Sequence, residues 1–138
     1  MNKAIAVISL LACTTSVGAQ EGNPQFRHEA ERTALGWVCG LSAMEAVQCK
    51  AQGKRWCTME ELLRVGGEKD PSAGNPDYRY SIAVNGDDIS ISAIPRRPGL
   101  GGFLNDRTGV YFNPDGPASR NATKIRGGAD CDYLRAKF

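Results

Sequence analysis

The chain has 138 residues, with 17 Lys or Arg against 15 Asp or Glu, so its formal net charge is only +2. No dense basic cluster accompanies this balance, and we therefore expect no nucleic acid among its partners. The length suits one small domain behind a targeting segment.

The first 19 residues are typical of a signal peptide. Lys3 supplies a positive start, an apolar run follows, and Val17-Gly18-Ala19 offers the small residues of a cleavage site before Gln20. The apolar run is about half of the roughly 20 residues that a membrane-spanning helix needs. We predict a signal peptide over 1–19, one globular domain over 20–138 without a transmembrane segment, and a periplasmic or secreted location.

A second processing route stays open. Leu10-Leu11-Ala12-Cys13 resembles a bacterial lipobox, in which Cys13 is lipidated and becomes the mature N-terminus. The protein would then be a lipoprotein of the outer membrane.

Four cysteines remain after the signal peptide, and an even number in a small exported domain indicates two disulfides. No C-x-x-C spacing occurs, so we expect neither a thioredoxin-like redox motif nor an ordinary zinc site, and no cofactor or metal. Of the three pairings, we prefer Cys49 with Cys57, which joins a helix end to the next turn, and Cys39 with Cys131, which ties down the tail. The spacing leaves the other two pairings open.

Two helices are predicted before any strand. Apolar residues at helical spacing predict a long helix over 26–52, with Gly53 as its C-cap. Thr58 and Glu61 have capping-box spacing and predict a short helix that ends at Gly66-Gly67. The apolar stripe of the long helix comprises Ala30, Ala34, Trp37, Val38, Leu41, Met44, Val47 and Ala51.

Strands follow the helices. Alternation over 78–84 predicts a strand, and Asn85-Gly86 predicts a tight hairpin to a return strand over 89–93. Further short strands are predicted at 103–105 and 110–112. This order predicts an α+β fold, in which the long N-terminal helix packs on a three- to four-stranded antiparallel meander.

The order of these signals resembles the globular domain of type IV pilin-like proteins, which include the type II secretion pseudopilins. The resemblance covers about residues 28–113. It implies the helix-on-meander fold. The segments that carry it are Ala34-Leu35 to Leu41-Ser42-Ala43, Gly53-Lys54-Arg55-Trp56, Thr58 to Leu62, Tyr78-Arg79-Tyr80, Asn85-Gly86-Asp87, Ser92-Ala93-Ile94-Pro95, Phe103 to Asp106 and Thr108-Gly109-Val110, with Tyr111 where the family has Ile.

The chain departs from that family at its N-terminus. It has no prepilin-peptidase site and lacks the N-terminal transmembrane helix that polymerises true pilins. The resemblance therefore implies a fold and not pilus assembly. Some pilin-like proteins bind calcium in loops that correspond to 70–77 or 106–115, which leaves a calcium site as an alternative.

Catalytic signals are sparse. His28 is the only histidine, and its place at a helix start favours a structural role. The carboxylate pairs Glu60-Glu61 and Asp87-Asp88 fit a helix first turn and a hairpin turn. Trp56 becomes a candidate contact residue if it is exposed beside Cys57.

We therefore predict a non-catalytic, exported, pilin-like domain that binds or scaffolds a protein partner in the cell envelope or outside the cell. One alternative is a lipoprotein, lipidated at Cys13, that acts as an envelope assembly factor. Another is a small secreted hydrolase or enzyme inhibitor.

Overall fold

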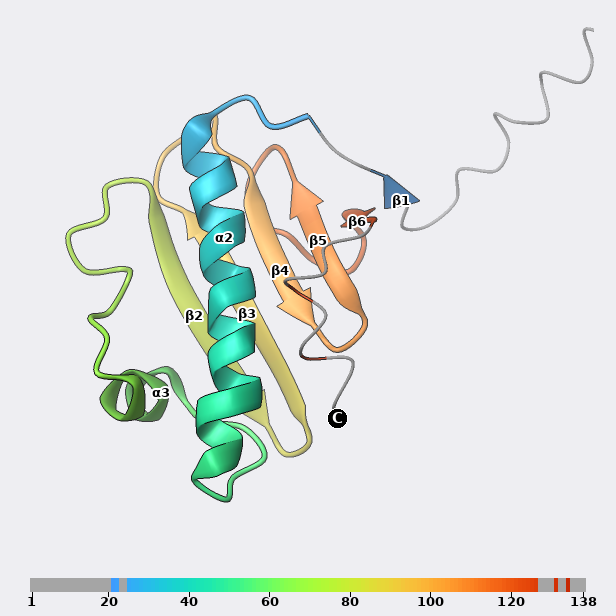
Figure 1. Ribbon diagram of the computed structural model, residues 1–138. Helices are drawn as coiled ribbons and strands as arrows, with labels where there is room; N and C mark the ends of the chain where they lie inside the picture. The colour runs from blue at the N-terminus through green and yellow to red at the C-terminus, as the bar shows by residue number, and fades with distance from the viewer. Residues whose placement is uncertain (1–20, 23–24, 127–130, 132–133, 135–138) are drawn as a thin grey trace, which may run out of the picture.

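The protein folds as one sheet covered on one face by helices (Figure 1). The structure is a computed structural model that describes residues 21–22, 25–126, 131 and 134. The predicted signal peptide and Cys13 lie outside the described residues. The helical elements are α2 (Glu29–Met44), a π-helical turn η1 (Glu45–Cys49) and α3 (Met59–Gly66). The strands are β1 (Glu21–Gly22), β2 (Tyr78–Asn85), β3 (Asp88–Pro95), β4 (Gly102–Asp106), β5 (Gly109–Asn113) and β6 (Thr123–Ile125).

The six strands have the spatial order β1-β6-β5-β4-β3-β2. Neighbours from β2 to β6 are antiparallel, whereas β1 joins β6 in parallel. The predicted hairpin is present, since Asn85 pairs with Asp88 and Gly86 has a φ of 62°. In Figure 1, α2 crosses the sheet over β3 and β4. α3 lies beside η1, at the C-terminal end of α2.

The predicted fold, a long N-terminal helix on a three- to four-stranded meander, is wrong. The sheet has six strands, because β6 adds to the edge of β5 and β1 adds to β6. β6 has only three residues between turn formers, too few for a period-two pattern. The helical layer also differs, because α2 and the π-helical turn η1 replace one regular helix over 26–52, whereas α3 matches the predicted short helix.

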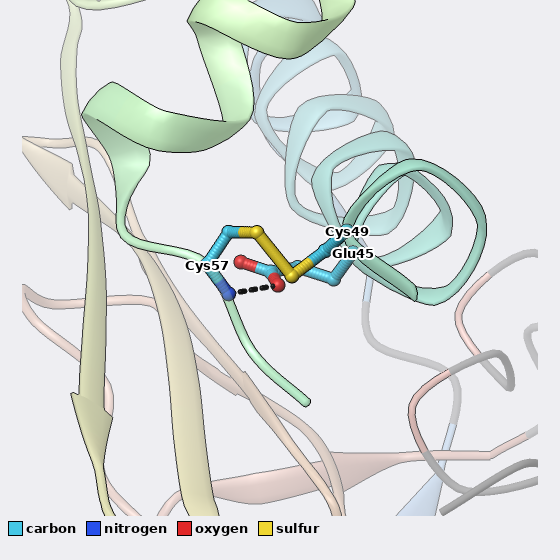
Figure 2. A group of neighbouring side chains, drawn as sticks. All are labelled: Glu45, Cys49 and Cys57. Atoms are coloured by element: carbon cyan, nitrogen blue, oxygen red, sulfur yellow. Dashed lines mark hydrogen bonds between the residues drawn. A yellow bond between two sulfur atoms is a disulfide. The ribbon is translucent and has the colours of Figure 1, made fainter. Parts of the chain in front are cut away.

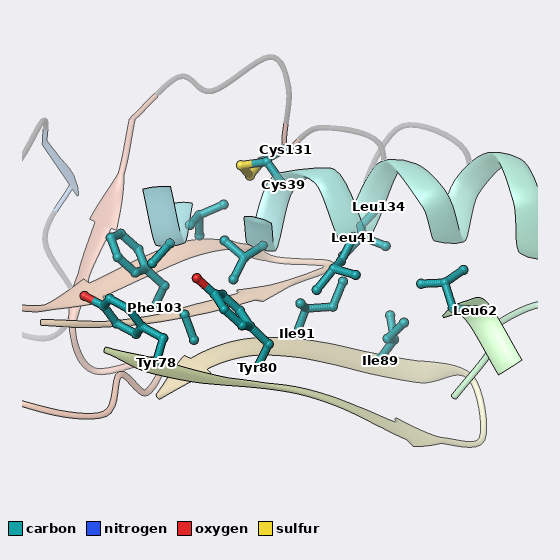
Figure 3. Packing of buried hydrophobic residues seen from close by; sticks show 14 of the residues in the cluster. Cys39, Leu41, Leu62, Tyr78, Tyr80, Ile89, Ile91, Phe103, Cys131 and Leu134 are labelled. Atoms are coloured by element: carbon teal, nitrogen blue, oxygen red, sulfur yellow. A yellow bond between two sulfur atoms is a disulfide. The ribbon is translucent and has the colours of Figure 1, made fainter. Parts of the chain in front are cut away.

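The core lies between α2 and the sheet face that it covers. Figure 3 shows Leu41 of the helix facing Ile91, with Tyr80 and Phe103 lying along the same layer. The side chain of Asn105 on β4 is buried and donates to the Val38 carbonyl oxygen at 3.1 Å, which ties the helix backbone to the sheet. The largest fully buried apolar side chains are Tyr78, Phe103, Leu41, Leu62, Ile91, Leu100 and Leu134.

A buried carboxylate fixes the start of α2 to the loop between β3 and β4. Glu31 is fully buried, and its Oε1 accepts from the backbone N–H groups of Arg27 (2.8 Å) and His28 (3.2 Å). Its Oε2 accepts from the backbone N–H of Gly101 at 2.7 Å. Because buried polar groups are costly without partners, these three bonds explain how Glu31 sits in the core.

Two glycines make a matched test of this packing. A Cβ on Gly101 would lie 2.7 Å from the Asn113 carbonyl oxygen, whereas a Cβ on Gly40 in α2 would meet nothing within 4 Å. We expect Gly101→Ala to lower the free energy of unfolding by about 1–3 kcal/mol through overpacking. Gly40→Ala should raise it by about 0.5–1 kcal/mol, the usual gain in a helix. Urea unfolding of both variants checks this, and equal midpoints would contradict the close approach at Gly101.

Candidate functional site

Two disulfides hold the domain, and they are the pairs preferred from the sequence. Cys39 on α2 is joined to Cys131, with the two Cα atoms 4.5 Å apart. Cys49 on η1 is joined to Cys57 ahead of α3, with the two Cα atoms 5.8 Å apart. Disulfides are typical of chains that fold in an oxidising compartment.

The two disulfides close loops of very different length. Cys39 and Cys131 are 92 positions apart, and Cys49 and Cys57 are 8 apart. In the chain-entropy account the longer loop gives more stability, roughly 4–5 kcal/mol against roughly 2–3 kcal/mol. The first disulfide therefore has the stronger case for a purely structural role.

The π-helical turn η1 carries the buried side chains beside the second disulfide. A π-turn takes one residue more than an α-turn, so the stripe after it leaves the 3.6-residue period. Val47, which the helical stripe placed on the apolar face, is 61% exposed. Glu45 and Cys49 are instead fully buried. π-turns occur frequently at functional sites, which directs attention to this one.

Glu45, Cys49 and Cys57 form the candidate site (Figure 2). The carboxyl oxygen of Glu45 and the two sulfur atoms all lie within 4.8 Å of one another. Glu45 Oε1 accepts a hydrogen bond from the backbone N–H of Cys57 at 2.8 Å. Its Oε2 is buried and has no hydrogen-bond partner among the residues that the structure describes.

Burial controls the charge of Glu45. Removal from water raises the pKa of its carboxyl group from 4.5 to about 7, although the hydrogen bond from Cys57 acts in the opposite direction. The negative charge of Glu61 on α3 raises this pKa further. Near neutral pH the Glu45 carboxyl group therefore divides between its protonated and its ionised form.

Glu61 on α3, whose charge acts on Glu45, has a lowered pKa and is ionised. Hydrogen bonds from the Lys54 ammonium group and from the backbone N–H of Thr58 lower the pKa of its carboxyl group to about 2. Thr58 in return accepts from the backbone N–H of Glu61 at 3.2 Å, which completes the predicted capping box. Glu61 is thus an ionised capping residue at neutral pH.

Trp56 does not meet the condition set for a contact residue. It is only 6% exposed, and its indole Nε1 donates to the Asp87 carbonyl oxygen at 2.9 Å. The guanidinium group of Arg55 lies over the ring at 5.8 Å. Trp56 therefore packs the segment before α3 onto the turn between β2 and β3.

The other sequence candidates take structural roles. His28 is exposed at the start of α2, where its backbone groups bond to Glu31. In the first predicted calcium loop, Asp70 accepts from the Ser72 N–H and Asp77 accepts from Arg97.

Asp106, in the second predicted calcium loop, is buried and accepts from Thr108 and Arg120. Burial raises the pKa of its carboxyl group, but these hydrogen bonds outweigh that effect, and the net pKa lies below the usual value. Its two oxygens are therefore already bonded to protein donors.

Sequence reasoning missed Glu45, although the sequence contains a signal for it. Leu41, Glu45 and Cys49 recur every four residues, so a carboxylate stands on the buried face in line with a cysteine. The interpretation of 26–52 as a regular amphipathic helix left this residue unexplained.

Comparison with protein families, with curated proteins and with solved structures finds no match to this chain. The resemblance to pilin-like domains stays a prediction. Among the residues that the structure describes, no helix is both long and apolar enough to span a bilayer.

The pKa of Glu45 predicts how stability depends on pH. A folded-state pKa of about 7 against 4.5 means that folding favours the protonated acid, so the contribution of Glu45 to stability is greatest below the lower value. Stability is lost as pH rises through 7, by roughly 2–3 kcal/mol between pH 5 and pH 8. Urea unfolding of the oxidised protein at both pH values measures this loss.

Glu45→Gln is the matched control, because an amide can still accept from the Cys57 N–H and does not ionise. The variant should show that much less pH dependence than the wild type. The same pH dependence in both proteins would contradict the account of Glu45.

Proposed function

We propose that the protein is an exported, non-catalytic binding domain that pairs with an extended segment of a protein partner at the outer edge of β2. The two disulfides support folding outside the cytoplasm. We place it in the periplasm or outside the cell, with the lipoprotein form as the alternative location. Binding rests on one observation, the open half of the β2 edge.

Along the first half of β2, the outward backbone groups are hydrogen-bonded to the loop that precedes the strand. The backbone N–H of Tyr78 donates to the Asn75 side chain at 2.9 Å, and that of Tyr80 donates to the Ser72 hydroxyl at 2.8 Å. The same hydroxyl donates to the Tyr80 carbonyl oxygen at 3.2 Å. These bonds show that the backbone groups of Tyr78 and Tyr80 point away from β3.

The second half of β2 is open. Backbone groups alternate along a strand, so those of Ile82 and Val84 point to the same outer side as those of Tyr80. Neither residue has a hydrogen bond on that side within the described part of the chain. Val84 is 37% exposed, and the flanking Ala83 and Asn85 are exposed too. The second half of β2, from Ile82 to Asn85, contains no charged residue and no proline, which suits addition of a partner strand.

Two observations support the non-catalytic part of the proposal. His28, on which any Cys–His or Ser–His scheme would depend, belongs to the start of α2. Asp106 and Glu31 are occupied by hydrogen bonds that hold the fold. A hydrolytic activity that disappears in His28→Ala would contradict this part.

Site-specific photocrosslinking tests the edge. The full-length chain, produced in its natural bacterial host, carries a photoreactive residue in place of Val84 or, as control, of the exposed Asp115 after β5. We expect a discrete adduct with one protein partner from position 84 and none from 115. The intact mass of the purified chain, expected to begin at Gln20, checks export in the same preparation.

A proline variant makes the test specific. Val84→Pro removes only an outward N–H, so it leaves the ladder to β3 intact. Added wild-type protein should compete for the adduct, whereas Val84→Pro should not. Equal adducts from positions 84 and 115, or equal competition by both proteins, would refute binding at this edge.

A further inference from the structure

In the oxidised protein, the group formed by Glu45, Cys49 and Cys57 contains a carboxyl oxygen that makes no hydrogen bond within the described residues. Both sulfur atoms are consumed by the disulfide, yet a buried carboxyl oxygen beside them has no partner among the described residues. A buried polar atom without a partner is costly in a core.

We propose that reduction of the Cys49–Cys57 disulfide by a dithiol opens a buried site for a thiophilic divalent cation such as Zn²⁺, with Glu45, Cys49 and Cys57 as its ligands. This site is independent of the β2 edge.

The donor set fits this class of ion. Thiolate sulfur and carboxylate oxygen are established zinc ligands, and a tetrahedral zinc ion holds such donors roughly 3.5–4 Å apart. The three donor groups already lie within 4.8 Å of one another. Breaking the sulfur–sulfur bond lets the two sulfur atoms separate to such spacings. Three protein ligands leave a fourth position for water or another ligand, as in open zinc sites.

The surrounding structure orients the carboxyl group toward the two sulfur atoms. Glu45 and Cys49 stand four positions apart on η1, and both are fully buried there. The Cys57 N–H holds Oε1 at 2.8 Å, which leaves Oε2 as the available donor. A hydrogen bond from a neighbouring protein group commonly orients a metal ligand in this way.

Reduction of the Cys49–Cys57 disulfide needs no reactant other than the dithiol. The dithiol gives two electrons and two protons, so its own disulfide forms as the Cys49–Cys57 bond breaks and both cysteines become thiols. The cation then binds the thiolates and the Glu45 carboxylate, and it displaces the protons that these groups carry.

Cadmium titration tests the site. The full chain is reduced with dithiothreitol, freed of it without oxygen, and titrated with Cd²⁺ while the sulfur-to-cadmium charge-transfer absorption is recorded. We expect one ion per chain, displaced by Zn²⁺, and no absorption from the oxidised protein. Glu45→Gln should weaken Cd²⁺ binding by roughly 10–100-fold or more. Removing a residue that only hydrogen-bonds to a metal ligand already weakens metal binding by about that factor.

Two cysteine variants separate this site from the other pair. Cys49→Ser should weaken Cd²⁺ binding strongly, because it removes a ligand of the site, whereas Cys39→Ser, which retains Glu45, Cys49 and Cys57, should bind Cd²⁺ as the wild type does. Circular dichroism follows the same titrations. If the reduced chain is unfolded, refolding on addition of Cd²⁺ that depends on Glu45 supports the site. Equal affinities of wild type and Glu45→Gln, folded or not, would overturn the proposal, as would an unchanged affinity for Cd²⁺ in Cys49→Ser.

Discussion

Burial of two carboxyl groups, one at each end of the helical layer, is the constraint on which the structure depends. Glu31 at the start of α2 accepts three backbone N–H groups, including that of Gly101 in the loop before β4. Glu45 at the start of η1 accepts one, from Cys57. The first carboxyl group therefore serves the fold alone. The second retains an oxygen that the described part of the fold does not use.

The difference between Glu31 and Glu45 follows from the local structure around η1. The π-helical turn brings Glu45 and Cys49 to the buried side and leaves Val47 in solvent. Trp56 packs the next segment onto the β2–β3 turn, and this places Cys57 against η1. A buried ionisable side chain with an unpartnered oxygen is unfavourable by itself. The presence of Glu45 in this turn indicates that the local sequence serves more than packing.

The sequence predicted those elements whose signals are local. The capping box of Thr58 and Glu61 and the Asn85-Gly86 hairpin are present, because each depends on residues a few positions apart. The two disulfides join the pairs that were preferred. The number of strands was not predictable in this way, since β6 is defined by its pairing with β5 and not by its own three residues.

Of the candidate site, the sequence indicated the cysteines and missed the carboxyl group. The predicted apolar stripe included Val47 and omitted Glu45, although Leu41, Glu45 and Cys49 recur every four residues and are the buried side chains. The exposure of Trp56, on which its candidate contact role depended, was not predictable for a related reason. Its burial depends on the Asp87 carbonyl oxygen, which is 31 positions away and comes close only in the folded chain.

The ionisation of Glu45 tests the central claim most directly. The oxidised protein, labelled with ¹³C at the glutamate side-chain carboxyl groups, is titrated by NMR, and Glu45→Gln identifies the Glu45 signal. The account predicts a midpoint near pH 7 for this signal. A midpoint near the ordinary glutamate value of about 4.3 would show that the carboxyl group is not held in an apolar site, and would contradict the account.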